Sequence, residues 1–268
     1  MYRKSSITIL TFVIAIFFGI TACGDNSTSV TEEEPPALPN LEYSQPDVSY
    51  FENTTVKLKS ASQNFLTAKS TVLSFSSLSS IGMLYGNILQ SAPQGEGSLN
   101  DGTWEWTYSY NYQGASSEMR VTAQESGNSI SWAVYWSYSD SEVTIEDYKL
   151  MEGTTQNDGL TGNWTFNSFG AESSTPIPLL TSSWVTDGEG ESEIDIEILD
   201  DSSGDVAISY DKAGSEFLMQ VTFETGGDNT EIGWNTETNL GYIQLGSDAP
   251  LCWDSSNNTV VDISCPGT

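Results

Sequence analysis

The sequence of 268 residues contains no histidine. This absence excludes a Ser-His-Asp triad, a Cys-His dyad and a histidine-ligated zinc site. Acid–base chemistry would then fall to carboxylates, tyrosines or lysines, and no recognisable catalytic motif frames any of them. Pairs of carboxylates arise by chance among 37 acidic residues, so they carry no signal for a glycosidase. We therefore expect a protein that is not an enzyme.

Basic residues are also scarce. Eight Lys and Arg stand against 37 Asp and Glu, which gives a net charge of −29. Because binding to nucleic-acid phosphates needs cationic side chains, we expect no nucleic-acid partner. The charge is typical of a well-solvated, soluble surface, and it would also attract cations. Aromatic residues make up 11% of the chain, which is too many for a wholly disordered protein.

The N-terminus has the pattern of a secretory signal peptide over residues 1–22. Arg3 and Lys4 form a short basic start, and an apolar run without charge extends from Ser5 to Ala22. The run is shorter than the roughly 20 residues that a membrane-spanning helix prefers. Its end, Ile20-Thr21-Ala22-Cys23, resembles the lipobox of bacterial lipoproteins. That resemblance implies cleavage before Cys23 and acylation of the Cys23 thiol and amino group.

A lipid on Cys23 would make the membrane a partner of this chain and the cell envelope its location. Gly24, and not an Asp, follows the cysteine. In Gram-negative lipoproteins this arrangement favours delivery to the outer membrane. Two or three acyl chains give stable anchoring, whereas one chain is marginal. Loss of Arg3 and Lys4 with the signal peptide would move the net charge from −29 to −31.

Residues 23–49 are predicted to be the lipidated cysteine and a disordered acidic linker. The segment is rich in Asn, Ser, Thr and Glu and has four prolines: Pro35, Pro36, Pro39 and Pro46. Such a composition cannot bury a core and is typical of a tether. Fully extended, it would reach about 85 Å.

Residues 50–92 are predicted to be a helical segment that packs on a sheet. Apolar residues recur there at spacings of three and four, for example at Phe65, Leu66, Val72 and Leu73. A second apolar run begins at Ile81, where glycines and serines weaken the helical pattern. We expect one or two helices.

Residues 93–268 are predicted to be an antiparallel β domain. Gly-rich turns separate runs in which apolar and polar residues alternate. Turn motifs at Ser126-Gly127-Asn128, Asp187-Gly188, Ser203-Gly204-Asp205 and Gly226-Gly227-Asp228 suit tight hairpins. The fold class is therefore mainly β, a meander of about 11 strands curled into a barrel or half-barrel. One face of its first strand would carry Trp104, Trp106, Tyr108, Tyr110 and Tyr112.

Cys252 and Cys265 lie in the tail after the last expected strand. With Cys23 acylated, they are the two remaining cysteines of a chain in an oxidising compartment. We expect a disulfide that closes this tail as a loop.

The aromatic residues suggest two kinds of function. Trp104, Trp106, Trp132 and Trp136 would either line an apolar cavity or form the core of a curled sheet. The architecture resembles the lipocalin-like and LolA-like carriers, and by that analogy the chain would be a non-catalytic lipoprotein that binds a lipid or another apolar small molecule. The alternative is a surface accessory or adhesin-like module with a solid core, which binds glycan or a partner protein through exposed aromatics and acidic loops. The oligomeric state stays open.

No cofactor is expected, with one candidate exception. Asp200, Asp201 and Asp205 cluster in a predicted turn and offer the oxygen ligands that Ca²⁺ prefers. The spacing does not fit the twelve-residue helix–loop–helix pattern, and a solvated hairpin turn explains the cluster equally well.

Overall fold

A computed structural model describes residues 34–36, 45–54, 62–76, 97–156, 158–168, 175–200, 204–256 and 259–266. The expected signal peptide, Cys23 and most of the expected linker lie outside these residues. In the part described, helix α2 (Ser49–Asn53) and a helix at residues 63–76 precede all the strands. Neither is long and apolar enough to cross a membrane.

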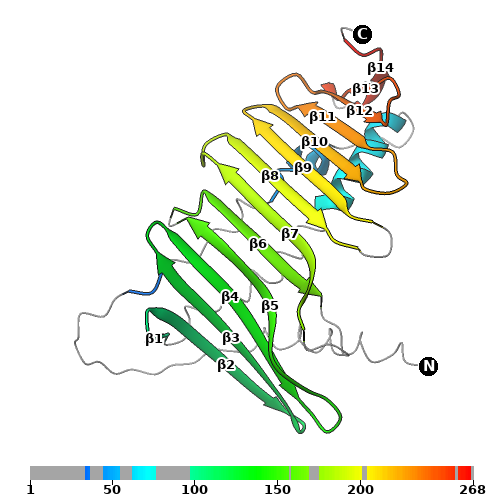
Figure 1. Cartoon of the computed structure of the whole chain (residues 1–268). Helices are drawn as coiled ribbons and strands as arrows, with labels where there is room; N and C mark the ends of the chain where they lie inside the picture. Colours follow the sequence, from blue (N-terminus) through cyan, green and yellow to red (C-terminus); the bar gives the residue numbers. More distant parts are fainter. Residues whose placement is uncertain are drawn as a thin grey trace.

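The strands form one antiparallel sheet in which every strand pairs with its neighbours in sequence (Figure 1). The strands are β1 (Ser98–Asn100), β2 (Thr103–Tyr112), β3 (Ala115–Ser126), β4 (Ser129–Ser139), β5 (Thr144–Gln156), β6 (Thr161–Ser168), β7 (Ile177–Thr186), β8 (Glu191–Ile198), β9 (Val206–Ala213), β10 (Glu216–Phe223), β11 (Thr230–Asn235), β12 (Leu240–Leu245), β13 (Leu251–Asp254) and β14 (Val261–Ile263).

The predicted fold class is confirmed. The chain is mainly β, and its sheet is an antiparallel meander preceded by two helices. The sheet has 14 strands where the sequence suggested about 11. Its two edges, β1 and β14, are not paired with each other, so the sheet is open and not a closed barrel (Figure 1), which fits the half-barrel form of the prediction.

The turn at Gly127 and Asn128 joins β3 tightly to β4, as its Gly motif predicts, whereas the motif at Gly226 lies in the longer connection of residues 224–229 between β10 and β11. Gly127 and Gly226 have φ angles of 63° and 74°, a left-handed conformation that glycine adopts without strain. In the β7–β8 turn, the backbone N–H groups of Gly190, Glu191 and Glu189 all donate to the carboxylate of Asp187. These bonds lower the pKa of Asp187 to about 2.

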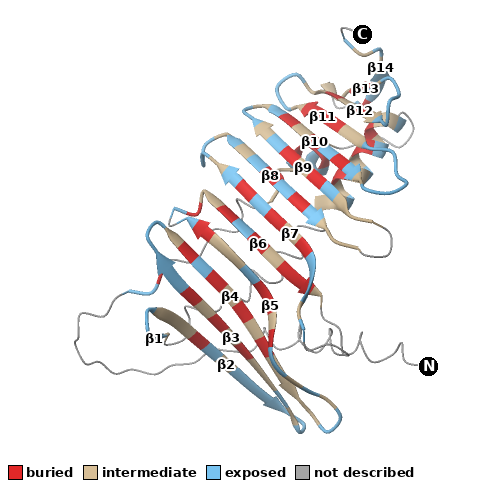
Figure 2. Cartoon of the chain, viewed as in Figure 1, coloured by how far each residue is buried: buried red, intermediate tan, exposed pale blue. Residues whose placement is uncertain are grey.

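One face of the sheet, which we call the inner face, carries the core. Buried and exposed residues alternate along most strands and align between strands as stripes (Figure 2). Phe and Trp side chains alternate here with Val, Ile, Leu and Met, as expected for a half-buried pleated sheet. Seven of the eight tryptophans are buried: Trp106, Trp132, Trp136, Trp164, Trp184, Trp234 and Trp253.

Several of these rings lie over glycines of the adjacent strand. Gly153 is paired with Trp132 on one side and with Trp164 on the other. Gly241 is paired with Trp234 and Trp253 in the same way. A Cβ atom at Gly241 would stand 2.3 Å from Cζ2 of Trp253, so only glycine leaves room for the ring. The flat indole rings thus fill the space that the glycines, which have no side chain, leave on this face of the sheet.

The two helices pack on the inner face of the last strands (Figure 1). The ring of Phe51 lies 5.0 Å from Trp234 and 6.2 Å from Trp253, and Phe65 lies 5.7 Å from Trp253. Trp253 Nε1 donates a hydrogen bond of 2.9 Å to the hydroxyl of Tyr50. All five side chains are buried, so residues 45–54 and 62–76 supply the second layer of the core at this end.

Polar contacts fix this segment to the sheet. Lys212 Nζ lies 3.1 Å from the carboxylate of Asp47, and the Asp47 N–H donates to the hydroxyl of Tyr210. Burial raises the pKa of Tyr210. Ser62 N–H donates to the carbonyl of Val260, close to β14. Asp47 is therefore bound to β9, and Ser62 to the segment just before β14.

The expected disulfide is present. Cys252 on β13 and Cys265 beyond β14 are joined across 13 residues of sequence. The tail is more regular than expected, because β13 and β14 continue the sheet inside this loop.

Candidate functional site: a groove on the outer face

The four tryptophans predicted to bind a ligand lie together on the inner face of β2 and β4. Trp106, Trp132 and Trp136 are buried, and Trp104 is partly buried and stacks on Trp106 at a centroid distance of 6.1 Å. Trp132 Nε1 donates to Thr155 Oγ1, and Trp136 Nε1 donates to a serine hydroxyl. The rings are thus part of the core. Ligand binding by them stays a prediction.

The acidic turn predicted to bind Ca²⁺ is only partly described. Asp201 lies outside the described residues, and the carboxylate of Asp205 accepts a hydrogen bond from the backbone N–H of Asp200. Glu224 in turn accepts the N–H of Asp205. Among described residues, no group of three His, Cys, Asp or Glu side chains is arranged to hold a metal ion. A cation site here stays a prediction.

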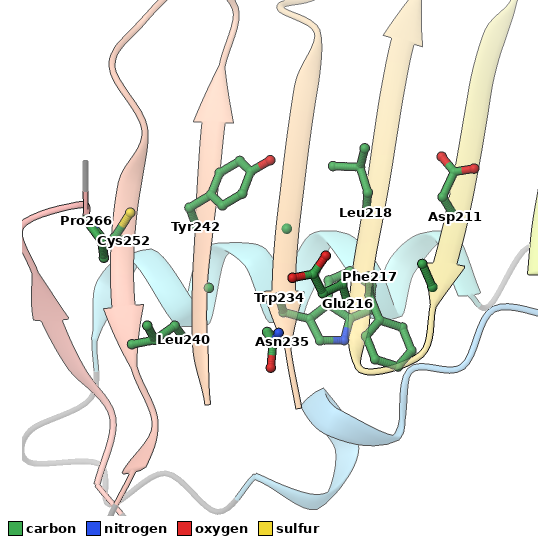
Figure 3. A pocket seen from close by; sticks show the side chains of 13 residues that line it. Asp211, Glu216, Phe217, Leu218, Trp234, Asn235, Leu240, Tyr242, Cys252 and Pro266 are labelled. Atoms are coloured by element: carbon green, nitrogen blue, oxygen red, sulfur yellow. The ribbon is translucent and has the colours of Figure 1, made fainter. Parts of the chain in front are cut away.

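The opposite face of the sheet, which we call the outer face, is hollowed over β9–β13. The groove has a volume of about 470 Å³, and the helix at residues 63–76 passes behind the strands that carry it (Figure 3). Its lining is Asp211, Ala213, Glu216, Phe217, Leu218, Gly233, Trp234, Asn235, Leu240, Gly241, Tyr242, Cys252 and Pro266.

Tyr242 forms an aromatic platform in this groove. Its ring lies over Gly233 on β11, where a Cβ atom would stand only 2.3 Å from Cε1 of the ring. Its hydroxyl donates a hydrogen bond of 2.7 Å to Glu231, whose second oxygen accepts one from Gln220. Burial, and after it the Glu231 carboxylate, raises the pKa of Tyr242 to about 12. The ring is therefore held in one position and stays neutral at physiological pH.

Carboxylates border the platform on the β9–β10 side. Asp211 and Glu216 project beside Leu218, while Cys252 and Pro266 close the far end (Figure 3). Asp211 is directly opposite Glu193 in the β8–β9 pair, which places like charges side by side. The groove thus offers a flat apolar floor and a rim of hydrogen-bond acceptors.

A second hollow of about 430 Å³ lies on the outer face over β6–β10. Short polar side chains dominate its outward-facing lining: Asn163, Thr165, Thr181, Ser183, Asp195, Glu197, Ser209, Gln220 and Thr222. Gln220 links the two hollows, since it also donates to the Glu231 carboxylate that holds Tyr242. The outer face therefore presents polar surface that leads to the aromatic groove.

The sequence places Tyr242 in a strand but gives no sign of the groove. The platform depends on Tyr242 being opposite Gly233, and that register follows from the β11–β12 turn and not from the composition of either strand. A glycine inside one strand and an aromatic residue in the next is the local signal that could have indicated it.

Comparison of the chain with family models, with curated proteins and with solved structures gave no match. The function must therefore be argued from the geometry of the chain itself.

Proposed function

We propose that this chain is a non-catalytic surface module of the cell envelope that binds a glycan in the outer-face groove. The observation that carries the proposal is Tyr242, a ring fixed by Gly233 beneath it and by Glu231 at its hydroxyl. A sugar ring stacks on such a platform, and an immobile ring loses little entropy when it does so.

The rim of the groove supports the same ligand class. Asp211 and Glu216 can each accept hydrogen bonds from sugar hydroxyls, and charged acceptors form stronger bonds than neutral ones. The Thr- and Ser-lined hollow over β6–β10 would hold further sugar units of an extended chain. Because the rim and the whole protein are acidic, neutral and amino sugars are favoured over sulfated or uronic ones.

The proposal includes a lipid on Cys23 as the link to the membrane. The described domain begins well after that residue, so the intervening linker would hold the groove away from the bilayer. Metabolic labelling with a palmitate analogue tests this part separately. Label on the wild-type chain and not on a Cys23→Ala variant is the expected result.

The binding experiment is a titration of the purified chain with a series of neutral, amino and uronic oligosaccharides, followed by calorimetry. We expect a neutral or amino sugar to bind. We expect Tyr242→Ala to weaken that binding about tenfold or more, which corresponds to about 1.4 kcal/mol. Tyr242→Phe keeps the ring and should bind nearly as well as wild type.

A matched control is Tyr135→Ala, because Tyr135 is, like Tyr242, a partly exposed tyrosine of the outer face, but it lies on β4 and does not line the groove. If no oligosaccharide of the series binds, or if both alanine variants weaken binding equally, the groove is not the site. Recovery of a lipid with the purified protein would instead support the apolar carrier predicted from the sequence.

A further inference from the structure

Strand β2 is much longer than β1, the strand that pairs with it on the side away from β3. β1 pairs only with residues Thr103 to Glu105, whereas β2 continues to Tyr112. From Thr107 onward, β2 has β3 on one side and no described strand on the other. Within the described residues, no strand therefore pairs with this side of β2 at Thr107, Ser109 or Asn111, and such an edge is a template for pairing with another strand.

The hairpin geometry shows which backbone groups this edge presents. Gln113 and Gly114 have φ angles of 49° and 88° and form a two-residue turn, so the flanking pair of Tyr112 and Ala115 is hydrogen-bonded. The N–H and C=O groups of successive residues in a strand point alternately toward one neighbouring strand and toward the other.

It follows that the N–H and C=O groups of Thr107, Ser109 and Asn111 point away from β3. The β1–β2 hairpin leads to the same assignment, because there Thr103 and Glu105 face β1. Thr107, Ser109 and Asn111 are all exposed, and Figure 2 shows the second half of β2 as exposed.

The residues of this edge are also uncharged. The sequence from Trp106 to Ser117 contains no charged residue, in a chain with a net charge of −29. Tyr110 and Tyr112 are 40% and 47% exposed, and their rings stack at 6.3 Å. A second copy of an acidic protein would meet little repulsion here and would gain apolar contact.

We propose that the free edge of β2 pairs with the same edge of a second copy. The strands run antiparallel about a two-fold axis at Ser109, which joins the two sheets into one. Thr107 then faces Asn111 of the partner subunit, and Tyr108 faces the partner subunit's Tyr110.

The sequence Thr107 to Tyr112 suits this register because small polar and aromatic residues alternate on the two faces. Aromatic cross-strand pairs stabilise antiparallel strands. The interface is closed and self-complementary, so it gives a dimer and not a fibre.

The partner is a second copy because the residues of the edge carry no charge of their own that would select a basic or an acidic peptide. The nearest carboxylate, Glu118 on β3, already accepts a hydrogen bond from the hydroxyl of Ser109. The contact is short, so the dimer is expected to be weak and concentration-dependent. It does not depend on the glycan groove, which lies at the other end of the sheet.

The test uses charge at the two-fold axis, with the purified whole chain and sedimentation velocity over a range of concentrations. Ser109→Glu and Ser109→Lys each place two like charges opposite each other, and each should weaken the dimer about tenfold. A mixture of the two variants should restore it. Ser131→Glu is the matched control, because Ser131 is an exposed serine inside the sheet on β4 and should leave the dimer unchanged.

A second measurement does not depend on charge. Ser109→Cys should be joined to a second copy by a short bis-maleimide linker on intact cells, and Ser131→Cys should not. A wild-type chain that stays monomeric at all concentrations would overturn the proposal and leave the edge to a strand of another protein. A dimer that persists in both charge variants, or that is lost equally with Ser131→Glu, would overturn it too.

Discussion

Trp164 lies so close to Gly153 that a Cβ atom on the glycine would stand 2.2 Å from Cε3 of the ring. The two residues are directly paired between β5 and β6. Gly162 and Trp184 repeat the arrangement between β6 and β7, where the corresponding distance to Cη2 is 2.3 Å. Each ring covers the backbone of the neighbouring strand and occupies the space that a side chain larger than that of glycine would need.

Gly153→Ala should therefore destabilise the protein. The new methyl group would collide with Trp164 and with the carbonyl of Asn163, which is also 2.2 Å away. Overpacking of this kind costs about 1–3 kcal/mol of unfolding free energy. Urea denaturation measures the loss. Gly190→Ala is the control, since no atom lies within 4 Å of its Cβ position, and an equal loss there would contradict the packing argument.

Phe51→Ala should loosen the last strands of the sheet. Phe51 is fully buried between Trp234, Trp253 and Phe65, and truncation of a buried Phe costs about 3–5 kcal/mol. Because the two described helices pack on the last strands, hydrogen exchange of β11–β13 amides should increase more than that of β3 and β4. Glu52→Ala, an exposed neighbour in α2, should change neither. Uniform exchange along the sheet would show that the helices do not act locally.

Removal of the disulfide should also destabilise the end of the sheet that contains β13 and β14, because the unfolded chain would gain freedom. The bond between Cys252 and Cys265 closes a loop of 13 residues, and such a restriction of the unfolded chain is worth about 3 kcal/mol. Cys265→Ser combined with Cys252→Ala should lower the unfolding free energy by that order. A reducing agent should have the same effect on the wild type and none on the double variant. A double variant as stable as the oxidised wild type would contradict this account.

The alternation of apolar and polar residues predicted the sheet. The composition of single strands explains why some strands were less evident from the sequence than others. Ile194, Ile196 and Ile198 alternate with acidic residues and define β8 without ambiguity. By contrast, β3 has only Met119, Val121 and Ala123 as buried residues among small and polar ones, and β2 and β4 pair with it along its length. Pairing of this kind depends on tertiary structure and is not visible in one segment.

The candidate site was beyond prediction for a related reason. The tryptophans were the conspicuous residues, yet seven of them are buried in the core, and four of those, Trp106, Trp164, Trp184 and Trp253, lie against glycines. Tyr242 is one of 12 tyrosines and differs from the rest by its position opposite Gly233 and its bond to Glu231. Both features depend on the register of β12 against β11.

Tyr242 should titrate well above an ordinary tyrosine. Burial is the larger cause of its raised pKa of about 12, and Glu231 is the next, because ionisation would place a phenolate beside a carboxylate. Ring-carbon NMR of tyrosine-labelled protein measures this value directly. Glu231→Gln should lower the pKa of Tyr242 without returning it to 10, since burial remains. A Tyr242 pKa near 10 in the wild type would show that the ring is not held as described.

The same shift predicts how stability depends on pH. The folded pKa lies above the unfolded value of 10, so the fold favours the neutral phenol. The contribution of Tyr242 to stability is therefore complete below pH 10 and is lost as the pH rises from 10 through about 12. Tyr242→Phe cannot ionise, and its unfolding free energy should fall less steeply across this interval than that of the wild type. The remaining buried tyrosines, such as Tyr210, are common to both proteins and cancel in the difference. Identical slopes for the two proteins would contradict the burial of this hydroxyl against Glu231.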